Sequence, residues 1–106
     1  MEYIVAIDLG GMSAKGALFS LDNQIICECK TPTNALDGFE GTVQKLSDLF
    51  FCLLEKSGVK KDEVRAVGVG APGVVDSTSG CVLRWTNFGW NDVPLAKRLS
   101  ALTGIY

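Results

Sequence analysis

The spacing of apolar residues changes near residue 39, and this change constrains the fold more than any other feature of the sequence. Before it, three short stretches show the apolar runs or the alternation typical of β-strands. They are Tyr3–Leu9, Ala14–Leu21 and Gln24–Thr31. The joints between them, Gly10–Ser13 and Leu21–Asn23, are short and rich in turn-forming residues. The sequence therefore predicts an antiparallel meander of three strands.

Beyond residue 39, apolar residues recur every three or four positions, as on one side of a helix. The stripe consists of Phe39, Val43, Leu46, Leu49, Phe50, Leu53 and Leu54. Gly58 follows where a helix often ends in left-handed geometry. We expect an amphipathic helix from about Glu40 to Ser57.

The rest of the chain predicts a buried strand, a small hairpin, a loop and a last helix. The strand is Arg65–Ala71, and the hairpin pairs Val74–Asp76 with Cys81–Trp85. Residues 87–91 are expected to form the loop. Asp92 is expected to cap the last helix, with Pro94 in its first turn and Gly104 beyond its end.

The predicted order, βββαβ followed by a hairpin and a helix, describes an α/β fold. A helical crossover returns a strand parallel to the strand it left, so the fourth strand should run parallel to the first in a mixed sheet. The glycine-rich loops that follow these two strands should then lie at the same end of the sheet.

The composition limits the classes of protein to which this chain can belong. The 106 residues are 47% hydrophobic and 21% charged, with a net charge of -2, as in one globular domain. This balance disfavours disorder and nucleic-acid binding by bulk charge. Apolar runs are too short to span a bilayer, and strand-like sequence begins almost at Met1, so we expect neither a membrane partner nor a signal peptide. A cytoplasmic protein is expected.

The chain has four cysteines and no histidine. Two disulfides are conceivable, but Cys27 and Cys29 are two residues apart on one face of an expected strand, and Cys52 lies in a helical pattern. We expect free, buried thiols. The zinc spacing is missing, so no zinc site is predicted in this chain.

The first candidate site follows the first strand. Asp8 precedes Gly10 and Gly11, and Lys15 returns to the same end on the second strand. A carboxylate, bare backbone amides and a cation suit a nucleotide phosphate with Mg²⁺. The alternative is a tight hairpin in which the glycines only supply turn geometry. Neither the P-loop nor the dinucleotide-binding fingerprint fits, because no helix follows the glycines.

Two further candidates follow the fourth strand. One is Gly70–Gly73 with Asp76 close behind, and the other is Asn87–Trp90. Small residues, a side-chain amide and an indole suit a sugar, whose hydroxyls need polar partners while its C–H face packs on aromatic rings. The alternatives are a turn role for Asn87 and core packing for Trp85 and Trp90.

These motifs, in this order and spacing, closely resemble the N-terminal lobe of the ROK family (repressor, open reading frame, kinase). The resemblance rests on Asp8–Gly11 with Lys15, Val67–Asp76, and Asn87–Trp90 with Pro94–Leu95. It covers essentially all of residues 1–106, which would form one ATPase-like lobe. It implies a ribonuclease H-like fold, as in actin, chaperones and sugar kinases, and ATP-dependent phosphorylation of glucose or a related hexose.

The resemblance also assigns residue roles. Asp8, Gly10 and Gly11 match the motif that faces the ATP phosphates and Mg²⁺, with Asp8 acting on the metal indirectly, and Lys15 matches its basic position. Pro72, Gly73, Asp76 and Asn87 match positions that border or bind the sugar. The family usually has Thr where this chain has Met12; Ser13 offers a hydroxyl one residue later, expected on the other face of the strand.

Other parts of the family pattern lie beyond Tyr106, among them the last core strand, the catalytic Asp and the zinc cluster. No catalytic residue is therefore expected in this chain, which should not turn over alone. Association of chains through an exposed strand edge is expected. The alternative functions are the sugar-sensing lobe of a ROK transcriptional repressor and a non-catalytic domain of the actin type.

Overall fold

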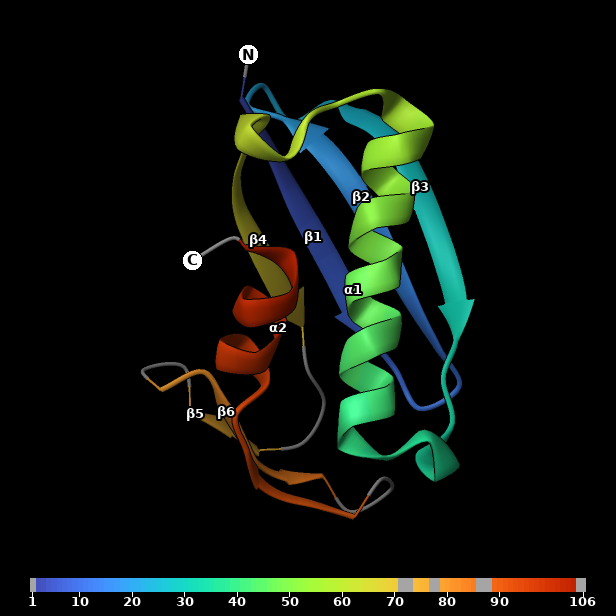
Figure 1. Cartoon of the computed structure of the whole chain (residues 1–106). Helices are drawn as coiled ribbons and strands as arrows, with labels where there is room; N and C mark the ends of the chain where they lie inside the picture. Colours follow the sequence, from blue (N-terminus) through green and yellow to red (C-terminus); the bar gives the residue numbers. More distant parts are fainter. Residues whose placement is uncertain (1, 71–73, 77–78, 86–88, 105–106) are drawn as a thin grey trace.

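The main sheet of the protein has four strands in the order β3-β2-β1-β4 (Figure 1). The computed structural model describes residues 2–70, 74–76, 79–85 and 89–104. The strands are β1 (Tyr3–Leu9), β2 (Ser13–Ser20), β3 (Ile25–Pro32) and β4 (Val64–Gly70). The first three pair antiparallel, and β4 pairs parallel to β1. The predicted meander and mixed sheet are confirmed.

Helix α1 (Gly38–Ser57) packs across one face of this sheet (Figure 1). The predicted stripe is its buried side, with Val43, Leu46, Phe50 and Leu53 fully enclosed. Gly16 of β2 lets the helix approach, because a Cβ there would lie 3.1 Å from Leu53 Cδ1. As predicted, the helix ends at Gly58, which is left-handed with φ +78°.

Short connections flank α1. The 3₁₀ turn η1 (Ala35–Asp37) leads into it, and η2 (Lys61–Glu63) leads from it into β4. Neither turn was expected from the apolar periodicity, because each spans only three residues. No helix in the described part of the chain is long and apolar enough to cross a membrane.

The expected hairpin is present but belongs to a three-stranded sheet. β5 (Val74–Asp76) and β6 (Cys81–Trp85) pair antiparallel, and β6 also pairs with β7 (Trp90–Val93). The prediction of a loop over residues 87–91 was therefore wrong at its carboxyl end, where Trp90 and Asn91 belong to β7. The strand forms because Trp90 pairs with Trp85, and both indoles are buried and meet edge to face with ring centres 5.1 Å apart.

The last helix, α2 (Leu95–Thr103), packs against α1 and ends at left-handed Gly104, as expected. The predicted cap was wrong. Pro94 is the N-cap residue rather than part of the first turn, and Asp92 lies in β7 with φ +50°. Pairing of β7 with β6 holds Asp92 in the strand, two residues away from the position where its side chain could cap the helix.

The four cysteines are free, as expected, but they are not uniformly buried. Cys27, Cys29 and Cys81 are half-buried, whereas Cys52 is exposed. Cys52 lies on the flank of α1 beside β3, outside the buried stripe, which the helical spacing alone did not reveal.

Candidate phosphate-binding site

Four residues on neighbouring strands form one row at the carboxyl end of β1. Asp8 pairs with Lys15 on β2 and with Gly70 on β4, and Lys15 pairs with Lys30 on β3. Residues paired across strands project from the same face of a sheet. Since Gly16 faces α1, this row belongs to the opposite face, and all four residues are exposed. A carboxylate and two ammonium groups therefore share one open surface.

The end of β4 leaves room for the Asp8 carboxylate. A Cβ placed on Gly70 would lie 3.7 Å from Asp8 Oδ1, so a larger side chain there would crowd this oxygen. The parallel pairing of β1 and β4 brings these residues together, as the crossover argument predicted.

The turn between β1 and β2 is closed by a backbone hydrogen bond from Gly10 N to Ser13 O, 2.9 Å long. A Cβ on Gly10 would lie 2.9 Å from the same oxygen, whereas a Cβ on Gly11 would meet open space. Met12 sits in the turn with 87% of its surface exposed. Ser13 begins β2 on the face that also carries Lys15, so its hydroxyl lies on the side of the ionic row.

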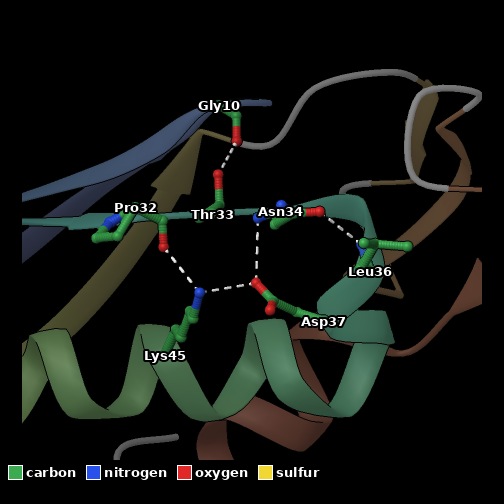
Figure 2. Close-up of polar contacts among 7 residues, drawn as sticks. All are labelled: Gly10, Pro32, Thr33, Asn34, Leu36, Asp37 and Lys45. Carbon is green, nitrogen blue, oxygen red and sulfur yellow. Dashed lines mark hydrogen bonds and ion pairs between the residues drawn. The ribbon is translucent and has the colours of Figure 1, made fainter.

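The β3–α1 connection anchors this turn (Figure 2). Thr33 Oγ1 donates a 2.8 Å hydrogen bond to Gly10 O. Thr33 N also donates to Met12 O at 3.0 Å. The Thr33 side chain is buried. Both ends of the glycine turn are thus held by one residue that lies more than twenty positions away in the sequence.

A small polar network fixes the segment that carries Thr33. Asn34 and Asp37 form a reciprocal capping box around η1, with Asn34 Oδ1 accepting from Leu36 N at 2.9 Å. Lys45 of α1 donates to Asp37 Oδ2 at 2.8 Å and to Pro32 O at 3.1 Å (Figure 2). The hydrogen bond and charge of Lys45 hold the pKa of Asp37 below its usual range. The turn is therefore braced against the first turns of α1.

An open pocket of about 420 Å³ lies beside the turn. Met12, Ser13, Lys30 and Pro32 line it. Its volume is in the range of small-ligand sites, and Lys30 gives it a positive charge. The ammonium of Lys30 and the hydroxyl of Ser13 suit a phosphate group in this pocket. Asp8 is not part of the pocket lining and lies two strands away from Lys30 on the same face of the sheet.

Sequence reasoning missed two residues of this site. Lys30 lies in an alternating strand, and only its register opposite Lys15 places it in the row. Thr33 follows Pro32 in a stretch without periodicity. The Asn34-x-x-Asp37 spacing was the one available signal, since it is the pattern of a capping box.

The predicted sugar-side residues are only partly described. Asp76 ends β5 and pairs with Cys81. Pro72, Gly73 and Asn87 lie outside the described residues. Trp85 and Trp90 are buried, and Phe39 of α1 packs edge to face on Trp90 at 5.2 Å, so both indoles belong to the core.

Comparison with known proteins decides the family. The family model described as "ROK family" matches residues 4–106. The chain belongs to the ROK family. The glucokinases of Halalkalibacterium halodurans and Thermotoga maritima are 29% and 31% identical to it over 102 residues. These alignments cover 96% and 95% of the chain but 31% of each relative, so the chain spans about a third of their length.

A solved structure gives the same assignment. The ROK family glucokinase from Streptomyces griseus, in complex with glucose and AMPPNP, superimposes with a TM-score of 0.84 at 25% identity. It is matched over 97% of this chain and 31% of its own length. The ribonuclease H-like fold expected from the motifs is confirmed. The chain is also similar to a transcriptional repressor. The xylose repressor of Caldicellulosiruptor bescii is 39% identical over 56 residues, which cover 49% of this chain and 14% of the repressor.

Proposed function

We propose that residues 1–106 form the N-terminal lobe of an ATP-dependent ROK sugar kinase that phosphorylates glucose or a related hexose. The observation that carries the proposal is the meeting of Asp8, the glycine turn and Gly70 at one end of the sheet. Similarity to two glucokinases over nearly the whole chain supports it. The proposed use of ATP also favours a cytoplasmic location.

In this proposal the turn and the ionic row receive the phosphates of ATP. The amide of Gly11, the hydroxyl of Ser13 and the ammonium of Lys15 bind phosphate oxygens. Gly10, whose amide already donates to Ser13 O, shapes the turn rather than donating to the phosphate. Lys30 adds a second ammonium beside the pocket. Hydrogen bonds from Thr33 keep the turn in one conformation, so little ordering is required when the phosphates bind.

The residues fit a magnesium ion at one position. The Asp8 carboxylate is exposed at the strand end, and Gly70 leaves its Oδ1 accessible. Mg²⁺ in kinases is held by one or two carboxylates together with water and phosphate oxygens. When bound, the ion neutralises charge on the phosphates during transfer, and Asp8 would hold it directly or through water.

The proposed sugar contacts are Pro72, Gly73, Asp76 and Asn87, each taken from the family motif it matches. The proton of the attacking sugar hydroxyl needs a base, which in this family follows a later strand. We therefore expect no kinase activity from residues 1–106 alone.

The test is a kinase assay of the complete gene product with Mg²⁺, ATP and a panel of hexoses. Asp8→Asn should lower kcat by about 10²–10³-fold, because it removes the charge that holds the metal. Asp62→Asn is the matched control, since it makes the same change on an exposed residue at the opposite end of β4. The absence of phosphorylation of every hexose would refute the kinase proposal.

The second candidate is the sugar-sensing lobe of a ROK repressor, which the similarity to the xylose repressor favours. A repressor would bind its sugar without phosphorylating it and would carry a DNA-binding segment ahead of Met1. Calorimetry with sugars in the absence of ATP, together with the sequence upstream of Met1, separates the two functions.

A further inference from the structure

Two cysteines face each other between β3 and α1. Cys29 Sγ and Cys52 Sγ are 3.0 Å apart, although the residues are 23 positions apart in the sequence. Cys29 lies on the face of β3 that contacts α1, and Cys52 lies on the flank of the helix. This separation exceeds a disulfide bond by only about 1 Å, so a small side-chain movement would join the two sulfurs.

The other cysteines are placed differently. Cys27 lies two residues before Cys29 on the same face, but its thiol donates to the carbonyl of Leu53 at 3.6 Å. Cys81 lies in β6 of the second sheet and contacts Ser79. The geometry therefore singles out one pair from the four cysteines.

We propose that Cys29 and Cys52 form a thiol–disulfide site, which is oxidised reversibly by a low-molecular-weight disulfide such as oxidised glutathione. This inference is independent of the proposed kinase function. Thiol–disulfide exchange needs an accessible first sulfur and a second sulfur within reach, and this pair supplies both.

The reaction proceeds in two exchanges. Cys52, which is exposed, loses its proton and attacks one sulfur of oxidised glutathione; an S–S bond to Cys52 forms and one glutathione thiol leaves. Cys29 then loses its proton and attacks Cys52 Sγ, forming the protein disulfide and releasing the second glutathione thiol. Two protein thiols are oxidised, and one glutathione disulfide is reduced to two thiols.

Burial supports this order of attack. Desolvation, followed by the hydrogen bond with Cys52, raises the pKa of Cys29 to about 11, so its thiol is protonated at neutral pH. An incoming disulfide therefore meets Cys52 first. Cys29 acts once the mixed disulfide has placed an electrophilic sulfur beside it.

The disulfide would join the middle of β3 to α1. It would close a loop that contains Thr33, Asp37 and Lys45, which brace the glycine turn. A cross-link of this length restricts the unfolded chain and so stabilises the folded one. Oxidation would thus stiffen the support of the proposed phosphate site without altering the site itself.

The experiment oxidises the 106-residue chain at low concentration with oxidised glutathione, alkylates the remaining thiols and maps the peptides by mass spectrometry. We expect two of the four cysteines to resist alkylation, a Cys29–Cys52 linked peptide, and a Tm at least about 5 °C higher that dithiothreitol reverses. Cys52→Ser should abolish the linkage and the Tm shift. Cys81→Ser and Cys27→Ser, the matched controls, should retain both.

Four alkylated cysteines after oxidation would overturn the proposal. A Cys27–Cys52 peptide, a glutathione adduct that stays on Cys52, or disulfide-linked dimers as the main product would overturn it equally. Peptide mapping of the unaltered chain gives these answers even if a cysteine variant fails to fold.

Discussion

At the scale of single residues, the candidate site depends on where a side chain is absent. Gly70 leaves space beside Asp8 Oδ1, and Gly10 allows the backbone to close on Ser13. Asp8, Lys15 and Lys30 contribute charge from a regular strand register. The glycines shape the site, and the charged side chains give it its chemistry.

The two glycines of the turn should respond differently to the same substitution. Gly10→Ala places a Cβ 2.9 Å from Ser13 O, so the backbone must shift, and we expect a loss of about 1–3 kcal/mol in the free energy of unfolding. Gly11→Ala meets open space and should change it by less than about 0.5 kcal/mol. Urea denaturation of both variants checks the prediction, and equal losses would contradict it.

At the scale of elements, α1 is the part that connects the rest of the lobe. It packs on the main sheet, braces the glycine turn through Lys45 and contacts α2. The contact with α2 includes a bidentate pair, in which Arg98 Nε and Nη2 donate to the Glu40 carboxylate at 3.0 and 2.7 Å. Figure 1 shows α2 lying beside α1 over the β4 side of the sheet.

This ion pair makes stability depend on pH in a defined direction. The hydrogen bond and charge of Arg98 hold the pKa of Glu40 below its usual range. A depressed carboxyl pKa stabilises the fold above the ordinary glutamate pKa, and that stabilisation is lost as the pH falls through the lowered value. Glu40→Gln should therefore lower the Tm at pH 7, and the difference from the unaltered chain should shrink below about pH 4.

Glu55→Gln is the control for this measurement, because it makes the same change on an exposed glutamate of α1 that forms none of the described ion pairs. Its Tm should stay close to that of the unaltered chain at pH 7. If the difference in Tm between Glu40→Gln and the unaltered chain grew as the pH fell, the assigned role of Arg98 would be contradicted.

At the scale of the whole molecule, β4 is an edge strand of the main sheet within the described residues. An edge strand presents backbone groups that can pair with another chain. The small residues Ala66, Gly68 and Gly70 are exposed along it. The edge is therefore the surface through which we expect copies of the chain to associate.

Sedimentation over a concentration series tests this expectation. The chain should shift toward dimers or larger species at high concentration. Ala66→Lys should raise the concentration at which dimers form, because a charge on an edge strand opposes pairing. Leu36→Lys is the control: it lies on the exposed η1 turn and should leave that concentration unchanged. A single monomeric species at every concentration would refute the prediction.

Some of this architecture follows directly from local sequence. The stripe from Phe39 to Leu54 specified α1, and Gly58 and Gly104 marked the ends of both helices, because helix formation and termination depend on neighbouring residues. The Asp8–Gly11 motif indicated a turn at the end of a buried strand. Asp92 shows the limit, since its local preference for a helix cap yielded to the pairing of β7 with β6.

What the sequence determined by itself was the order of elements, the mixed sheet and the glycine turn beside Asp8, since periodicity and chain connectivity encode all three. Only the tertiary structure decided that Lys30 joins the row of Asp8, that Thr33 anchors the turn and that Cys29 meets Cys52. Each of these contacts joins residues distant in sequence. Whether such residues meet in space is set by strand register and helix packing, which depend on the whole core rather than on any local pattern.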